Sequence, residues 1–99
     1  MTVRWTAQAL ERLVEIETFI AARDPAAATR VVERLVTRGE ALARLPYRGR
    51  RVPEVPSGQL RELVHGNYRI VYRIRARVVE ILTVFEGHRL LPRKDVAGR

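Results

Sequence analysis

Residues 61–75 read RELVHGNYRIVYRIR, the most regular pattern in the chain. Apolar and polar residues largely alternate on both sides of His65-Gly66-Asn67, as they do in strands that bury one face. A Gly-Asn pair between two such runs indicates a β-hairpin. We therefore expect antiparallel strands at 60–64 and 68–75.

The next run, VVEILTVF within residues 78–86, is apolar at almost every position. A strand of this kind is usually covered on both faces. We expect a central strand here, reached through a weaker turn at 75–77. We expect an irregular chain from Gly87 onward and a mobile tail at about 92–99.

Two helices are predicted before this hairpin. Residues 2–5 alternate as a short first strand, and Thr6 can cap a helix over 7–23. The Asp24-Pro25 corner then begins a second helix over 25–44, which makes an antiparallel helix hairpin. Apolar residues recur along both helices at helical spacing: Leu10, Leu13, Val14, Ile16, Phe19 and Ile20 in the first, and Ala28, Val31, Val32, Leu35, Val36 and Leu42 in the second.

Gly39 interrupts the second helical stripe. Glycine costs about 1 kcal/mol relative to alanine inside a helix, so it marks either a close backbone approach or early fraying. Residues 45–59 contain three of the five prolines and are predicted to be a loop.

The element order β-α-α-β-β-β indicates an α+β fold, with the helix hairpin on one face of a small, mainly antiparallel sheet. Ninety-nine residues suit one domain, 1–99. The chain contains no cysteine, which excludes disulfides and thiolate metal sites and fits a reducing cytoplasm. No stretch approaches the roughly 20 apolar residues of a membrane span, and we expect no signal peptide.

The charge balance is strongly basic. Lys+Arg number 19 against 11 Asp+Glu, for a net charge of +8, and Lys94 is the single lysine. A GC-rich coding bias can explain the preference for arginine but not the net excess. That excess favours a polyanionic partner, either nucleic acid or an acidic protein.

The strand at 68–75 sorts its residues onto two faces. One face carries Tyr68, Ile70, Tyr72 and Ile74, and the other carries Arg69, Val71, Arg73 and Arg75. We expect the first face to meet the helices and the second to present guanidinium groups, joined by Arg61 from the neighbouring strand. The alternative is an ordinary face on which these arginines pair with Glu62 and Glu80 across strands.

A set of short motifs supports a family resemblance. In chain order they are Val3-Arg4-Trp5-Thr6, Ile20-Ala21-Ala22, Asp24-Pro25-Ala26-Ala27-Ala28, Leu45-Pro46, Gly49-Arg50, Arg61-Glu62-Leu63, Tyr68-Arg69-Ile70-Val71-Tyr72-Arg73, Ile81-Leu82-Thr83-Val84 and Gly87-His88-Arg89. This ordered set resembles the RelE/ParE superfamily of bacterial type II toxin–antitoxin toxins, over nearly the whole chain.

The resemblance implies a small basic toxin held inactive, in a hetero-oligomer, by an acidic antitoxin encoded beside it. ParE-type toxins poison DNA gyrase and are not nucleases, whereas RelE-type toxins cleave messenger RNA on the ribosome without a metal. No cofactor is implied by either activity. The fold is shared and does not choose between them, but the Trp5-Thr6 start and the alanine-rich corner favour a ParE-like toxin.

Candidate site residues follow from these two activities. Metal-free RNA cleavage needs an acid, a base and a group that stabilises phosphorane charge. Only in the RelE-like case would Arg61, Arg69 and Arg73 hold phosphate, with His88 as acid or base and Glu86 as base or orienting group. The single lysine and the absence of a tyrosine after Tyr72 depart from the RelE pattern. The candidate target- or phosphate-binding residues are Arg61, Arg69, Arg73, Arg75 and Arg89.

Two plainer interpretations stay open. His88 can be a polar residue at a strand end, and His65 a solvated residue beside a turn. A third hypothesis is a plain nucleic-acid-binding module, which needs aromatic side chains among the basic ones. Tyr68 and Tyr72 fall on the opposite face of their strand from its arginines, so they do not meet that need.

Overall fold

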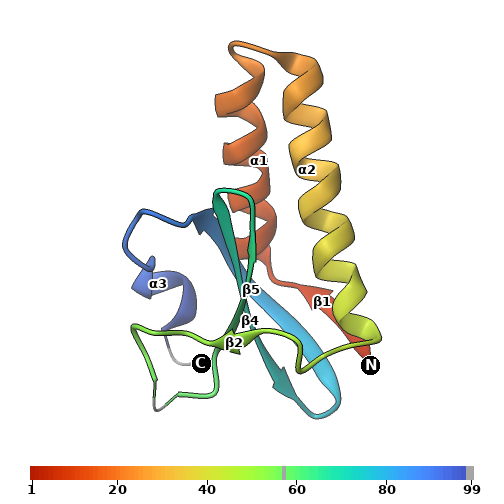
Figure 1. Ribbon diagram of the computed structural model, residues 1–99, viewed down its shortest axis with the longest axis vertical. Coiled ribbons are helices and arrows are strands. Elements are labelled where there is room, and N and C mark those ends of the chain that lie inside the picture. The colour runs from red at the N-terminus through yellow and green to blue at the C-terminus, as the bar shows by residue number, and fades with distance from the viewer. Residues whose placement is uncertain (57, 98–99) are drawn as a thin grey trace.

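The computed structural model describes residues 1–56 and 58–97. A helix hairpin packs on one face of a five-stranded sheet of order β1-β5-β4-β3-β2 and extends beyond its end (Figure 1). The elements are β1 (Thr2–Trp5), α1 (Ala7–Ala21), α2 (Pro25–Glu40), the 3-10 turn η1 (Ala41–Ala43), β2 (Arg50–Arg51), β3 (Arg61–His65), β4 (Tyr68–Arg75), β5 (Val78–Glu86) and α3 (Arg93–Val96). The predicted α+β fold is confirmed.

The sheet is mainly antiparallel, and its single parallel pair joins β1 to β5. The predicted β3–β4 hairpin is confirmed, and Gly66 takes the positive φ of 58° that its tight turn requires. The β4–β5 turn is made by Ala76 and Arg77, with φ of 52° and 62°. A left-handed conformation costs a residue with a Cβ roughly 1 kcal/mol, so this second turn is held by the long strand pairing around it.

Thr6 connects the sheet to the first helix. Its hydroxyl oxygen accepts a hydrogen bond from the Ala9 amide at 3.2 Å, which caps α1 as expected. The same hydroxyl donates to the Ile81 carbonyl at 2.9 Å, beside that of Leu82 at 3.2 Å. The β4–β5 register slips here, leaving Leu82 in a bulge. One side chain therefore fixes both the start of α1 and the irregularity in β5.

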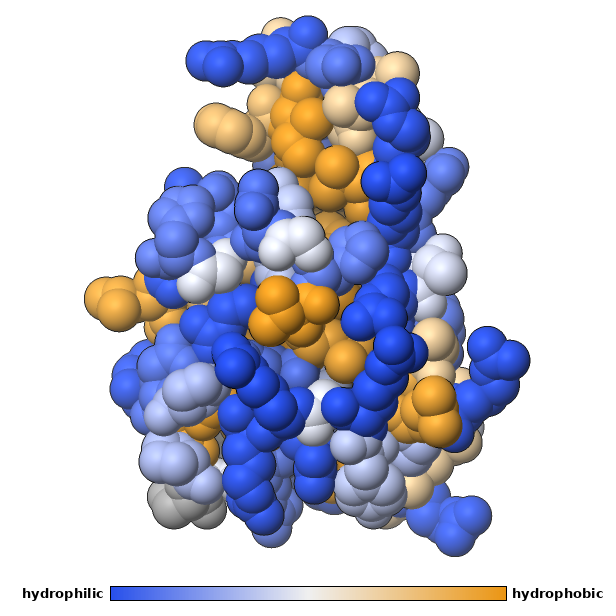
Figure 2. All heavy atoms as spheres, viewed as in Figure 1, coloured by the Kyte–Doolittle hydropathy of each residue, from blue (hydrophilic) through white to orange (hydrophobic). Residues whose placement is uncertain are grey.

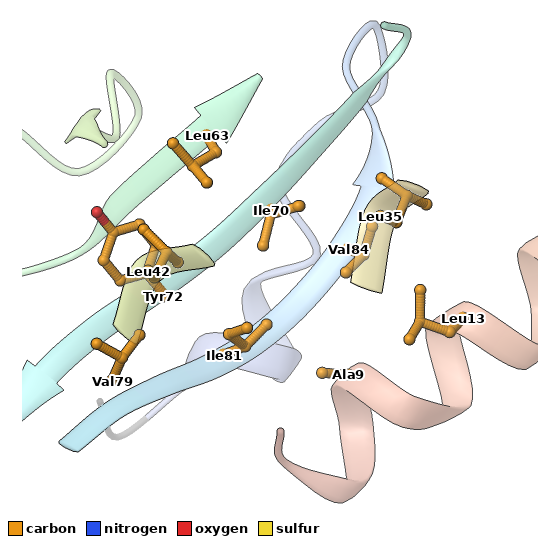
Figure 3. Close-up of a cluster of buried hydrophobic side chains, with 10 residues drawn as sticks. All are labelled: Ala9, Leu13, Leu35, Leu42, Leu63, Ile70, Tyr72, Val79, Ile81 and Val84. Atoms are coloured by element: carbon orange, nitrogen blue, oxygen red, sulfur yellow. The ribbon is translucent and has the colours of Figure 1, made fainter. Parts of the chain in front are cut away.

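Apolar residues cover the sheet on both faces. Figure 3 shows the cluster on the helix side, where Leu35 lies beside Val84 and Leu42 lies beside Tyr72. The predicted inward face of β4 is therefore correct. The opposite face carries a second cluster: Val52, Leu60, Val71, Leu82, Phe85, Leu91 and Val96. The expectation that β5 is covered twice is confirmed.

Two predicted irregular segments contain regular structure. The loop over 45–59 includes β2, which pairs Arg50 and Arg51 with β3. The chain after Gly87 includes α3, because Leu91 and Val96 fill the second cluster and draw this segment onto the sheet. The mobile tail predicted at 92–99 lies partly outside the described residues, which end at 97.

The predicted helical stripes are wider than the buried faces of the helices. Leu10, Val14 and Phe19 are 50%, 61% and 73% exposed, because α2 and the sheet cover only the side of α1 that carries Ala9 and Leu13. The second helix also ends earlier than the predicted residue 44, where η1 tightens its last turn.

At Gly39, α2 approaches β1 and β5 closely. A Cβ built at this position would lie 2.5 Å from Cζ2 of Trp5 and 2.9 Å from Cδ1 of Ile81. The indole cannot easily move away, because its Nε1 donates to Glu40 at 2.9 Å. Gly39 therefore lets α2 settle onto β1.

We predict that Gly39→Ala destabilises the protein by about 1–3 kcal/mol, because overpacking outweighs the gain in helix propensity. Urea unfolding measures the change. Thr37→Ala, at an exposed position of the same helix, is the matched control and should be neutral or slightly stabilising. A Gly39→Ala protein as stable as the parent would show that the packing against Trp5 is loose.

Candidate functional site

Glu80 is the centre of one charged cluster on the sheet face that α3 covers. Its side chain is almost fully buried, and it stands in register with Arg4 on β1 and Arg73 on β4. Arg73 donates to the carboxylate at 2.7 Å, Arg4 forms a further ion pair, and Arg75 lies 3.8 Å away. Three guanidinium groups therefore surround one buried carboxylate.

Glu62 is the centre of a second cluster. Arg50 from β2 and Arg69 from β4 each donate to its carboxylate at 2.8 Å. Arg69 also makes a bidentate pair with Glu54 at 2.7 and 2.8 Å and lies 4.8 Å above the ring of Phe85. These hydrogen bonds from Arg69 lower the pKa of Glu54 from 4.5 to about 2.

The expectation that this face of the sheet presents accessible guanidinium groups is therefore wrong for Arg69 and Arg73. Arg69 and Arg73 are only 7% and 8% exposed, and both are held in ion pairs. The alternative, pairing with Glu62 and Glu80 across strands, is confirmed. The reason is electrostatic, since a carboxylate removed from water needs cations close by.

The other candidates lie in two places. Arg61 is half-buried at the β2–β3 edge, where it donates to the Gly49 carbonyl at 2.8 Å. Glu86 ends β5, with His88 and Arg89 each 3.5 Å from its carboxylate.

These two places are well separated on the sheet. Glu86 pairs with Tyr68, whereas Arg61 pairs with Tyr72. Four residues of strand separate the two rows, about 13 Å. The structure brings Glu86, His88 and Arg89 together but does not bring Arg61 or Arg73 to them.

A groove of about 400 Å³ opens beside the Glu86 cluster, between α1 and the segment after β5. Phe19 and Ile16 line it from α1, and Leu90 from the opposite side. Phe19 and Leu90 are 73% and 88% exposed. Figure 2 shows apolar side chains exposed along the helix hairpin, flanked by hydrophilic ones. An exposed apolar strip of this kind is typical of a partner surface.

Sequence reasoning missed this groove because helical spacing places Phe19 in the core. The charged rim of the groove includes Arg12, Glu15, Glu86 and Arg89. Burial raises the pKa of Tyr68, which also lines the groove, and the nearby Glu86 raises it further.

The C-terminal segment is fixed beside this groove by one carboxylate. Asp95 accepts hydrogen bonds from Arg12 at 2.7 and 3.0 Å and from the Thr83 hydroxyl at 2.9 Å. Burial raises the pKa of Asp95, but these hydrogen bonds outweigh it and leave the pKa below its ordinary value. Asp95 thus joins α3 to both α1 and β5.

Within residues 1–56 and 58–97, no three histidine, aspartate, glutamate or cysteine side chains gather in a way that could hold a metal ion. In the same part of the chain, no helix is long and apolar enough to cross a membrane.

The sequence and the fold both match known toxins. Residues 3–91 match the family described as the ParE toxin of type II toxin-antitoxin system, parDE. A protein of Sinorhizobium fredii named "Putative toxin Y4kP" is 47% identical over a 94-residue alignment that covers 91% of this chain and 92% of that protein.

Two solved structures share the architecture. The chromosomal ParDE toxin–antitoxin system from P. aeruginosa superposes with a TM-score of 0.74 at 23% identity, over 87% of this chain and 95% of that one. The RelBE2 toxin–antitoxin complex from Mycobacterium tuberculosis gives 0.65 at 27% identity, over 86% and 95%. At 23% identity, the similarity to the P. aeruginosa structure is evidence for the fold alone.

We predict that Glu54→Gln lowers the free energy of unfolding by about 1–3 kcal/mol at neutral pH, because it removes a charged partner of Arg69. The pKa of Glu54 is depressed on folding, so its ion pair stabilises the protein above pH 4.5 and is lost as the pH falls towards 2. Urea unfolding across this range should show the difference between parent and variant shrinking with acid. Glu33→Gln, at an exposed position of α2, should change little at any pH. A constant difference across this range would contradict the assignment.

Proposed function

The chain belongs to the ParE toxin family of type II toxin–antitoxin systems, and from that premise we propose that it stops growth by poisoning DNA gyrase. The observation that supports this is the confinement of Arg69 and Arg73 by buried carboxylates. A phosphate-cleaving enzyme needs its cations free to meet the charge that develops on the substrate. A poison that acts by binding needs no such gathering.

The separation of the remaining candidates supports the same proposal. Arg61 and the Glu86 cluster stand on strand rows about 13 Å apart. A general base and a phosphate ligand must reach one scissile bond together. A toxin that targets gyrase would act in the cytoplasm, as the cysteine-free composition led us to expect.

A RelE-like ribonuclease is the second candidate, and one cluster favours it. His88 and Arg89 are exposed and lie beside the half-buried Glu86 at the end of β5. An imidazole beside a carboxylate and a guanidinium could supply an acid or base with an orienting carboxylate and a cation.

The antitoxin is the partner that this protein shares with its relatives, and we propose that the groove beside α1 receives part of it. Phe19 and Leu90 offer apolar anchors. The exposed Arg89 at the rim would meet a carboxylate of an acidic segment, in keeping with the net charge of +8. A segment bound in the groove would also remove Phe19, the aromatic side chain of α1, from water.

We predict that the purified protein traps cleaved DNA in a gyrase supercoiling assay and leaves messenger RNA intact in a translating extract followed by primer extension. His88→Ala should keep the gyrase activity, because no gyrase role is assigned to that side chain. New message ends within the ribosomal A site, abolished by His88→Ala, would favour the ribonuclease instead. Silence in both assays would remove both candidates.

We predict that Phe19→Ala weakens binding of the adjacently encoded antitoxin by at least tenfold. Truncating an aromatic anchor that becomes buried in the complex removes a binding hot spot. Isothermal titration calorimetry measures the affinity. Leu45→Ala is the matched control, since Leu45 is also an exposed apolar residue but does not line the groove. Equal losses at the two positions would place the antitoxin elsewhere.

A further inference from the structure

Tyr47 is an exposed aromatic residue at the opposite end of the sheet from the Glu86 cluster. It is 62% exposed and sits in a turn closed by a 3.1 Å hydrogen bond from the Arg48 amide to the Leu45 carbonyl. The guanidinium of Arg61 lies 5.2 Å from its ring centroid, covering one face. With most of its surface in water, the ring keeps an accessible second face.

The turn that carries Tyr47 is anchored to the hydrophobic core. The hydroxyl of the fully buried Tyr72 donates to the Pro46 carbonyl at 2.8 Å and accepts from the Gly49 amide at 2.9 Å. A Cβ on Gly49 would lie 2.6 Å from that hydroxyl. Glycine at this position therefore permits the close approach, and Tyr47 is presented by a fixed turn rather than a loose loop.

The arginines around Tyr47 differ from those of the two Glu-centred clusters. Among the described residues, no carboxylate lies within ion-pair distance of Arg44, Arg48, Arg51 or Arg61. Arg51 and Arg61 donate to backbone carbonyls instead. Arg61 covers one face of the Tyr47 ring and Arg48 follows Tyr47 in the chain, so positive charge without a carboxylate partner lies beside this exposed tyrosine.

A small hollow adjoins the ring. It encloses about 200 Å³ and is lined by Tyr47, Arg51 and Arg61 together with Gln59, Leu60 and Ile74. Pockets for drug-sized ligands run from roughly 300 to 1,000 Å³. This hollow suits a single planar group better than a larger ligand.

We propose that this surface, the Tyr47 platform, binds single-stranded nucleic acid. An unpaired base stacks on the open face of Tyr47, and the flanking phosphates meet Arg44, Arg48 and Arg51. Aromatic stacking beside a basic track is how proteins hold single strands without reading their sequence, and the arginine fork matches phosphate oxygens. The proposal is independent of gyrase poisoning, and the platform meets the requirement for an aromatic among arginines that Tyr68 and Tyr72 could not meet.

The single strand is favoured over two other polyanions. A duplex keeps its bases stacked and offers Tyr47 no free base face. An acidic peptide would satisfy the arginines but gives no reason for an exposed ring on a turn pinned by Tyr72.

Fluorescence anisotropy with a short labelled oligothymidylate, and with a duplex of equal length, tests the platform on the full chain. Tyr47→Ala should weaken single-strand binding roughly five- to 150-fold, while Tyr47→Phe keeps it. The exposure of Tyr47 means that both variants should retain the parent melting temperature. Unchanged binding by Tyr47→Ala, or a duplex bound as tightly as the single strand, would overturn the proposal.

Two variants that each remove one positive charge distinguish binding at a defined site from general electrostatic attraction to the basic protein. Arg48→Gln and Arg30→Gln each remove one exposed arginine, the second from α2. Arg48→Gln should weaken binding and make the slope of log affinity against log salt shallower by about 0.7 for each phosphate that is no longer neutralised. Equal effects of the two variants would overturn the platform, as would a Tyr47→Ala protein that loses only antitoxin affinity. A negative result here leaves the gyrase assay unaffected, so the two proposals fail separately.

Discussion

Two buried carboxylates govern how this sheet is held together. Glu80 ties β1, β5 and β4 through Arg4 and Arg73, and Glu62 ties β2, β3 and β4. A buried charge stays ionised only when cations and hydrogen bonds replace its water. Removing one partner from such a pair typically costs about 3–5 kcal/mol, although an apolar replacement of the whole pair can be neutral. The two clusters thus fix which strands lie together more than they add net stability.

This constraint divides the arginines into two groups with different uses. Arg69 and Arg73 are committed to the fold, and their charge is cancelled locally. Arg48 and Arg51 face water without a carboxylate partner among the described residues and contribute to the field that a polyanion would meet. A basic composition therefore says that a partner is anionic, but only the pairing pattern says which face can receive it.

Much of the fold was readable from local chemistry, whereas the site was not. Alternation around Gly66 and the caps at Thr6 and Asp24 depend on neighbouring residues, so the hairpins were predicted correctly. β2 was not predicted because a two-residue strand is too short to show an alternating hydrophobic pattern. The exposure of Phe19 depends on how α1 tilts over the sheet, and a wide helical stripe does not encode that tilt. The pairing of Arg69 with Glu54 joins residues on a loop and a strand, which no spacing rule connects.

The order of the strands also bears on how the protein is made. β1 has β5 as its only sheet neighbour among the described residues, with Thr2 opposite Val78. Translation adds about 5–20 residues per second, so the first strand waits roughly 4–15 seconds for its neighbour. Pairings between distant parts of a chain also form slowly once both are present. Glu80 is synthesised after Arg4 and Arg73, so the charged cluster around it can form only once residue 80 has been made. The strand order therefore delays folding of the sheet. A chain that is still being synthesised on the ribosome is not yet a folded toxin.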